Sequence, residues 1–293
     1  MKLITAIKTP FNKYNRIDLN AFSNLLSRQI ESGINAVVIA GTTGEGHLLN
    51  QEERTNLIDY NVRNFDVNVI ANVGSNSTGK AIRATRQAFD VGADYALQVN
   101  PYYGKVCNNG MYHHLAECTK YGPTIMYNVP SRTGQDLPID VVKKLSKLDN
   151  FYGIKECHSI ERMQEYKNMN INMWCGNDEQ TPIVYNLKND TSLVGAISVI
   201  SNIVPEFSKS LVVNNDIDLK KNTILCDWLF QKPNPIGVNT ALAMMGYIKP
   251  VFRMPYLPLN ESERKRGKYI LEEYFNVEGI SLLKDEDFVI LKA

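Results

Sequence analysis

The seven residues FYGIKEC, Phe151 to Cys157, form a short apolar segment with a lysine near its end. Runs rich in Val, Ile, Leu and Ala occur eight times between residues 3 and 199, and segments with the apolar spacing of a helix lie between them. The runs begin about 30 residues apart at first and about 20 apart later, which is the length of one strand, one helix and two loops. They cover residues 3–7, 36–40, 68–73, 95–99, 124–127, 152–155, 171–175 and 192–199.

Eight strands that alternate with helices predict a (β/α)8 TIM barrel, which we assign to residues 1–222. A doubly wound sheet is the alternative, but Thr9–Asn12 after the first run lacks the glycine-rich phosphate-binding pattern of that fold. Beyond about residue 215 the rhythm changes to helical segments separated by prolines such as Pro233 and Pro235. We expect a C-terminal helical domain over residues 223–293.

The composition is that of a globular enzyme. The chain has 293 residues, of which 44% are hydrophobic, so it can bury a large core. Its 32 basic and 31 acidic residues give a net charge of +1, which argues against nucleic acid or an anionic membrane as a partner. The N-terminal MKLITAIKTP has neither a signal-peptide core nor transit-peptide character, so we expect a soluble, cytoplasmic protein.

The five cysteines and four histidines do not suggest a metal site. The cysteines are odd in number and form no C-x-x-C pair, so we expect reduced thiols. His113 and His114 are adjacent and would point in different directions from a helix, and no H-E-x-x-H pattern accompanies them.

In a TIM barrel the site lies at the carboxyl ends of the strands, so the residues that end each apolar run are the informative ones. Lys155 ends the sixth run and Tyr127 the fifth, which makes the two side chains neighbours. A buried amine becomes nucleophilic when its pKa falls by roughly 2–3 units from about 10.4. A phenol beside it can then carry the protons that Schiff-base formation requires.

Two further groups of residues are suited to binding carboxylates. Thr42 and Thr43 lie in the glycine-flanked loop GTTGEG, residues 41–46, whose N–H groups and hydroxyls can converge on an anion. Arg132 follows Tyr127 closely, and its guanidinium can bind a second carboxylate in bidentate fashion. The four kinds of group together indicate a site that forms an imine with a 2-oxo acid and receives a second acidic substrate.

With these residues in view, the sequence closely resembles the dihydrodipicolinate synthase (4-hydroxy-tetrahydrodipicolinate synthase) branch of the pyruvate-dependent class I aldolases, a family that also contains N-acetylneuraminate lyase. The resemblance runs over nearly the whole chain and is closest to the plant-type members. It is carried, in family order, by GTTGEG, NPYYGK, YNVPSRTGQD, GIKEC, CGND, GAISV, PNPIGVNTALAMMG and VFRMPYLPL.

The resemblance implies a role for each site residue in condensing pyruvate with L-aspartate-4-semialdehyde, a step of lysine biosynthesis by the diaminopimelate route. Lys155 would carry the pyruvate imine with no other cofactor, and Tyr127 and Thr43 would form a proton relay. The relay would be completed by Tyr103 from a neighbouring subunit of a homotetramer, a dimer of dimers. Thr42 and Thr43 would hold the carboxylate of pyruvate, Arg132 that of the semialdehyde, and Gly176, Asn177 and Ile197 would surround pyruvate.

One departure from the family concerns regulation. In lysine-inhibited members a second site at a subunit interface binds lysine, through residues matching Gln51, Arg54, Asn76, Lys80 and Tyr102. Asn76 and Tyr102 are retained, but Lys80 replaces a family glutamate and Arg54 a common histidine. Like charges a few ångströms apart in a partly desolvated site cost on the order of 1–4 kcal/mol, so we expect weak or absent feedback inhibition.

Other functions remain open from the sequence alone. A related lyase acting on N-acetylneuraminate or a 2-keto-3-deoxy sugar acid would use the same imine, although Ser131–Thr133 and the paired threonines favour the synthase branch. A catalytically silent barrel that binds a keto acid is a second alternative. A phosphate cradle at GTTGEG is a third, but it gives Lys155, Tyr127 and Arg132 no role.

Overall fold

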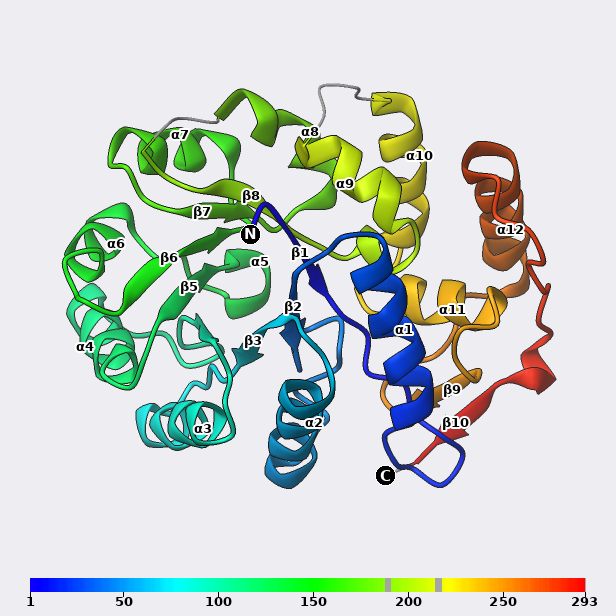
Figure 1. The fold of residues 1–293 in the computed structure, drawn as a ribbon, viewed down its shortest axis with the longest axis horizontal. Coiled ribbons are helices and arrows are strands. Elements are labelled where there is room, and N and C mark those ends of the chain that lie inside the picture. The colour runs from blue at the N-terminus through cyan, green and yellow to red at the C-terminus, as the bar shows by residue number, and fades with distance from the viewer. Residues whose placement is uncertain (188–190, 214–217, 293) are drawn as a thin grey trace.

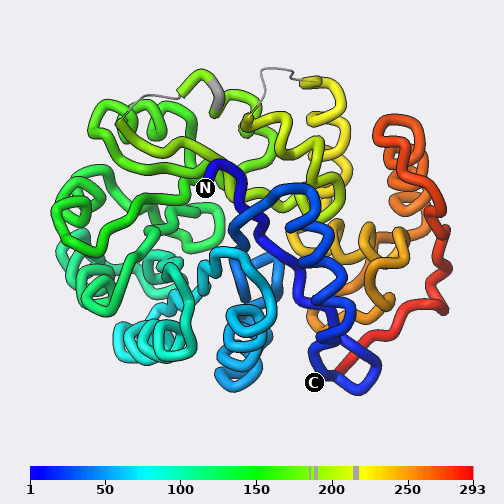
Figure 2. Tube along the Cα trace, viewed as in Figure 1, coloured from blue at the N-terminus to red at the C-terminus, as the bar shows by residue number. Residues whose placement is uncertain are grey.

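The computed structural model describes residues 1–187, 191–213 and 218–292. Eight parallel strands pair in chain order, and β8 closes on β1, so the predicted TIM barrel is confirmed. Figure 2 shows the chain passing once around this barrel, from blue through cyan and green to yellow. The strands are β1 (Leu3–Ala6), β2 (Ala36–Ile39), β3 (Asn68–Asn72), β4 (Tyr95–Val99), β5 (Thr124–Asn128), β6 (Phe151–Glu156), β7 (Met173–Cys175) and β8 (Val194–Ser198).

Each strand lies within or overlaps one predicted apolar run. The predicted start of the run and the observed start of the strand differ most at β7 and β8. The run at 171–175 begins two residues before β7 because the Ile171 N–H bonds back to the carbonyl of Tyr166 and so completes the end of the preceding helix. The Leu193 N–H, just before β8, bonds to the Asn172 side chain instead of a strand.

The helices surround the barrel and cover its strands, as Figure 1 shows. Their apolar faces and caps follow the sequence pattern: α1 buries Phe22, Leu25 and Leu26 and is capped by Asp18, and Asn50 caps α2. The helices of the barrel are α1 (Leu19–Glu31), α2 (Gln51–Asn64), α3 (Thr78–Asp90), α4 (Asn108–Thr119), α5 (Pro130–Thr133), α6 (Ile139–Leu145), α7 (Ile160–Asn168), α8 (Thr181–Val184) and α9 (Pro205–Val213).

The C-terminal part is helical and packs beside the barrel, where Figure 1 shows α10, α11 and α12 together. The expected boundary between residues 222 and 223 falls inside α10, so the first helix of this part begins before it. Buried side chains of this part share one apolar cluster with those of the first barrel units. Its elements are α10 (Leu219–Leu229), α11 (Ile236–Met244), β9 (Val251–Arg253), α12 (Glu261–Phe275) and β10 (Val289–Leu291).

Aromatic side chains pack inside the barrel. The rings of Tyr152 and Trp174 are stacked with centroids 5.9 Å apart, and the Trp174 indole N–H donates to the carbonyl of Met1. Among the residues that the structure describes, no helix is long and apolar enough to cross a membrane.

Candidate active site

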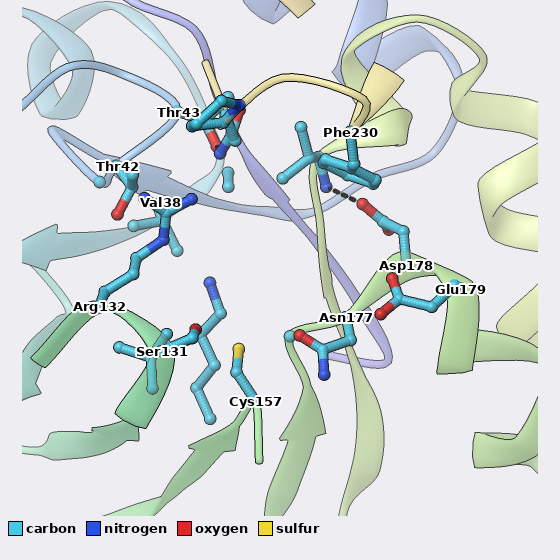
Figure 3. A pocket seen from close by; sticks show the side chains of 18 of the residues that line it. Val38, Thr42, Thr43, Ser131, Arg132, Cys157, Asn177, Asp178, Glu179 and Phe230 are labelled. Atoms are coloured by element: carbon cyan, nitrogen blue, oxygen red, sulfur yellow. Dashed lines mark hydrogen bonds between the residues drawn. The ribbon is translucent and has the colours of Figure 1, made fainter. Parts of the chain in front are cut away.

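A cavity of about 520 Å³ lies at the carboxyl ends of the barrel strands. It brings together most of the residues that the sequence singled out. Figure 3 shows Thr42 and Arg132 on one side of it and Asp178 and Glu179 on the opposite side. The predicted site residues that line it are Thr42, Thr43, Tyr127, Arg132, Lys155, Gly176 and Asn177.

Lys155 and Tyr127 are directly opposite each other on β6 and β5. The Lys155 ammonium nitrogen lies 4.5 Å from the centroid of the Tyr127 ring, and both side chains are buried. Lys155 and Tyr127 are therefore neighbours, as their positions in consecutive strand–helix units predicted. Gly176 makes room for this arrangement, because a Cβ at that position would lie 2.6 Å from Cε of Lys155.

Burial sets the electrostatics of Lys155. Desolvation lowers the pKa of Lys155 below its ordinary value, and the nearby Arg132 guanidinium lowers it further. Cys157 and Asp178 act in the opposite direction and are weaker than desolvation. A lowered pKa increases the fraction of Lys155 in the neutral, nucleophilic form at neutral pH.

Thr42 and Cys157 lie close enough to the Tyr127 phenol to act on its pKa. Burial raises the pKa of Tyr127 well above its ordinary value, so the phenol keeps its proton and is available as a donor. The expected partner was Thr43, but the Thr43 hydroxyl instead accepts a hydrogen bond of 2.9 Å from the Asn234 amide. In this structure the Thr43 hydroxyl is therefore engaged with the C-terminal part of the chain.

The loop that carries the threonines has an unusual backbone. Ala40 and Glu45 have φ angles of 55° and 53°, in the left-handed region that residues with a Cβ rarely adopt. A Cβ on Gly46 would overlap the Ala40 carbonyl, so only glycine fits there. Glu45 is held from inside by an ion pair with Lys8, and both side chains are fully buried.

Lys8 and Glu45 were not selected by the sequence analysis. Lys8 follows β1, so the same rule that selected Lys155 at the end of β6 could have identified it. Its partner could not be identified in this way, because Glu45 lies 37 residues away in a loop. The pair anchors the loop of Thr42 and Thr43 to the first strand.

Asp178 was also missed as a separate site residue. It is fully buried at the rim of the cavity, and its Oδ2 accepts hydrogen bonds from the backbone of Val199 and Ile200 at 2.8 and 3.1 Å. Burial raises the pKa of Asp178 to about 6. The carboxyl of Asp178 also lies close enough to Lys155 to act on its pKa.

Two predicted residues do not line this cavity, and a third lines it from an exposed position. Ile197 is buried in the barrel interior beside Tyr127 and does not line the cavity in the described part of the chain. Tyr103 is 94% exposed and has a φ of 69°, so its side chain is almost fully open to solvent in the single chain. Arg132, on the short helix α5, reaches the cavity from an exposed position.

The five residues of the expected regulatory site line a separate cavity of about 430 Å³. They come from α2, from α3 and from the loops after β3 and β4. Their proximity was implied by the family resemblance, and the structure shows it. They are Gln51, Arg54, Asn76, Lys80 and Tyr102.

No metal site accompanies these cavities: in residues 1–187, 191–213 and 218–292, no three His, Cys, Asp or Glu side chains gather closely enough to hold an ion.

Comparison with known proteins gives consistent results. A model of the dihydrodipicolinate synthetase family matches residues 1–274. The chain is 45% identical over 300 residues to the chloroplastic 4-hydroxy-tetrahydrodipicolinate synthase 1 of Arabidopsis thaliana, which covers 99% of this chain and 81% of that protein.

Two solved structures share the fold. A chloride-inhibited dihydrodipicolinate synthase from Acinetobacter baumannii, complexed with pyruvate, has a TM-score of 0.85 and 35% identity over 93% of this chain and 98% of the other. The dihydrodipicolinate synthase of Cyanidioschyzon merolae with lysine bound has a TM-score of 0.84 and 27% identity over 92% and 96% of the two chains. The family model and the plant relative both match nearly the full length of the chain, and the chain forms a barrel with a buried Lys155–Tyr127 pair. The chain therefore belongs to the dihydrodipicolinate synthetase family.

Proposed function

We propose that this protein is a 4-hydroxy-tetrahydrodipicolinate synthase, a lyase that condenses pyruvate with L-aspartate-4-semialdehyde. The observation that carries the proposal is the buried Lys155, 4.5 Å from the Tyr127 ring, in a cavity that Thr42, Thr43 and Arg132 also line. The relatives that match this chain over 99% of its length bear the same name. A sugar-acid lyase would use the same imine but is not favoured by these relatives.

The proposed reaction begins with attack of the neutral Lys155 amine on the C2 carbonyl of pyruvate. Loss of water gives the imine, and loss of a methyl proton gives the enamine, whose carbon attacks the aldehyde of the semialdehyde. The amine of the new product then attacks C2, which releases Lys155 and closes the ring. No cofactor beyond this covalent imine is required.

Tyr127 is proposed to pass protons in these steps. Its hydroxyl keeps its proton because burial raises the pKa, and Thr42, which lies close enough to act on that pKa, would give the proton a path away from the imine. We therefore assign Thr42 to the relay and Thr43, with the backbone of its loop, to the pyruvate carboxylate. Asn177 and the space left by Gly176 would bound the other side of pyruvate, with Ile197 beneath it.

Arg132 is proposed to bind the carboxylate of the semialdehyde. It lines the cavity near Lys155 and Tyr127, and its charge acts on both of their pKa values. A guanidinium can bind a carboxylate through two parallel hydrogen bonds, which would fix the aldehyde carbon relative to the enamine.

A homotetramer built as a dimer of dimers is proposed from Tyr103. An aromatic side chain that is 94% exposed on a backbone of positive φ is suited to insertion into another subunit, where it would complete the relay. Two compartments are candidates for the location of the protein. The sequence leads us to expect the cytoplasm, whereas the plant relatives are named as chloroplastic enzymes.

The test of the function is reduction with borohydride in the presence of isotopically labelled pyruvate. We expect one three-carbon adduct, which peptide mapping locates on Lys155, and condensation in an assay with aspartate semialdehyde. Lys155→Ala should lose both while keeping its thermal unfolding transition. Wild-type protein that turns over the two substrates without forming an adduct would contradict the imine mechanism, and an adduct without condensation would point to a different aldehyde.

A further inference from the structure

The cavity of about 430 Å³ away from the Lys155 site has an unusual charge. Three cationic side chains line it, Arg54 from α2 and Lys80 and Arg83 from α3. No aspartate or glutamate is among the described residues that line it. The cavity therefore concentrates three positive charges without an acidic partner in its wall.

The three cations are not neutralised elsewhere. None of them belongs to an ion pair found within residues 1–187, 191–213 and 218–292. Arg54 donates one hydrogen bond of 2.9 Å, from Nη2 to the carbonyl of Gly46. Its Nε is buried and has no hydrogen-bond partner in the described structure. A buried guanidinium donor that lacks an acceptor is costly, so an acceptor supplied by a ligand would stabilise it.

The α3 backbone adds to the positive field. Lys80 lies in the first turn of this 13-residue helix, and the N-cap residue Ser77 makes no side-chain hydrogen bond to that turn. The N–H groups of the first turn and the helix dipole both favour an anion there. The N-terminus of α2 is different, because Asn50 and Glu53 already cap it.

The remaining wall consists of neutral polar groups. The Gln51 and Gln87 amides are hydrogen-bonded to each other at 2.7 Å, which joins α2 to α3 at one side of the cavity. The Asn76 amide lies near the Tyr102 carbonyl, at 3.5 Å. Amides and a phenol can donate to oxygen atoms of a ligand while the cations balance its charge.

We propose that this cavity binds a small anion that carries at least two carboxylate or phosphate groups. Arg54 faces such a ligand from α2, and Lys80 and Arg83 face it from α3, so a compound with two or more anionic groups can satisfy both helices at once. A ligand amine would meet the same three cations and is disfavoured. The proposal concerns the occupant of this cavity and does not depend on the reaction at Lys155.

The test must separate this cavity from the Lys155 site, because Arg132 there also attracts anions. Calorimetric titrations at fixed ionic strength and fixed chloride would use citrate and inorganic pyrophosphate as polyvalent probes and acetate as a monovalent one. Lys80→Glu is compared with Arg86→Glu, which makes the same change of charge on α3 but lies outside the cavity lining. Arg132→Ala reports binding at the other site.

We expect the wild type to bind citrate or pyrophosphate more tightly than acetate, and the tighter of the two identifies carboxylate or phosphate as the preferred group. Lys80→Glu should weaken that binding at least about 10-fold, whereas Arg86→Glu and Arg132→Ala should change it by less than about 2-fold. Lys80→Gln should lose less affinity than Lys80→Glu. It tests the same position with a neutral side chain in case the charge-reversed variant does not fold.

Three results would overturn the proposal. The first is no binding of either polyvalent probe to the wild type. The second is an equal loss of affinity in Lys80→Glu and Arg86→Glu, which would indicate general attraction to a positive surface. The third is loss of binding in Arg132→Ala alone, which would place the anion at the Lys155 site.

Discussion

The two threonines of residues 41–46 have the same side chain but different surroundings. Thr42 lies close enough to Tyr127 to act on the pKa of its phenol, whereas Thr43 is 1% exposed and accepts a hydrogen bond from the Asn234 amide at 2.9 Å. Thr43 is therefore joined to the C-terminal part of the chain, and Thr42 to the barrel strand that lies beside Lys155. We propose that the difference separates a proton-transfer role of Thr42 from a role of Thr43 in holding the loop and binding pyruvate.

We expect Thr42→Val and Thr43→Val to affect different quantities. Thr42→Val removes the partner of Tyr127 and should lower kcat by about 10²-fold or more, as loss of a proton-transfer group does. Thr43→Val leaves the buried Asn234 amide unpaired and should lower the free energy of unfolding by about 1–3 kcal/mol, together with a higher KM for pyruvate. Steady-state kinetics and urea unfolding measure the two effects.

Tyr127→Phe serves as the control for the first effect, since it removes the same hydrogen bond from the other side. Its kcat should fall to a similar extent as that of Thr42→Val. If Thr43→Val lost kcat and Thr42→Val did not, the relay would run through Thr43 as the family resemblance implied.

At the scale of elements, α10 and α12 pack at a position where only glycine fits. A Cβ on Gly267 of α12 would overlap the ring of Trp228, which is fully buried in α10. The Trp228 indole N–H also donates to the carbonyl of Glu263, so the ring cannot rotate away without losing a hydrogen bond of 2.9 Å. The close contact joins the last long helix to the helix that follows the barrel.

We predict that Gly267→Ala destabilises the protein. Alanine favours a helix over glycine by about 1 kcal/mol, but overpacking in a closed core costs about 1–3 kcal/mol and the ring must also move, so the steric cost exceeds the propensity gain. Thermal and urea unfolding should show a net loss of stability.

Gly110→Ala in α4 is the matched control. A Cβ there would have its nearest neighbour, the Cys107 sulfur, at 3.7 Å, which is an ordinary contact. Only the gain in helix propensity applies, so this variant should be neutral or slightly more stable. Equal stability changes in the two variants would show that the Gly267–Trp228 contact does not restrict α12.

For the whole molecule, the charge of the second cavity bears on feedback control by L-lysine. Arg54, Lys80 and Arg83 would surround the ammonium of a lysine ligand with like charges. We expect no half-inhibition of the condensation below roughly 1 mM L-lysine. Initial rates with increasing L-lysine measure this directly.

The variant Arg54→His with Lys80→Glu provides the comparison, since it restores the residues typical of lysine-inhibited members at both positions. Its sensitivity to L-lysine should increase relative to the wild type. Strong inhibition of the wild type at sub-millimolar L-lysine would falsify the prediction.

The barrel and the Lys155–Tyr127 pair could be predicted, because both depend on the order of the apolar runs along the sequence. Eight apolar runs in succession specify eight strands, and consecutive parallel strands are neighbours, so Tyr127 and Lys155 had to be adjacent. The predicted run at 171–175 begins before β7 (Met173–Cys175), because Ile171 belongs to the end of the preceding helix.

The sequence by itself therefore determined the strand order, the carboxyl-end location of the site and the Lys155–Tyr127 pair. Only the tertiary structure decided that Thr43 meets Asn234, that Lys8 and Glu45 form a buried pair, and that Arg83 joins Arg54 and Lys80 in one cavity. The physical reason is distance along the chain. Strand periodicity is set by nearby residues, whereas the Thr43–Asn234 bond joins groups 191 residues apart, and such contacts exist only after the barrel has closed and the C-terminal helices have packed against it.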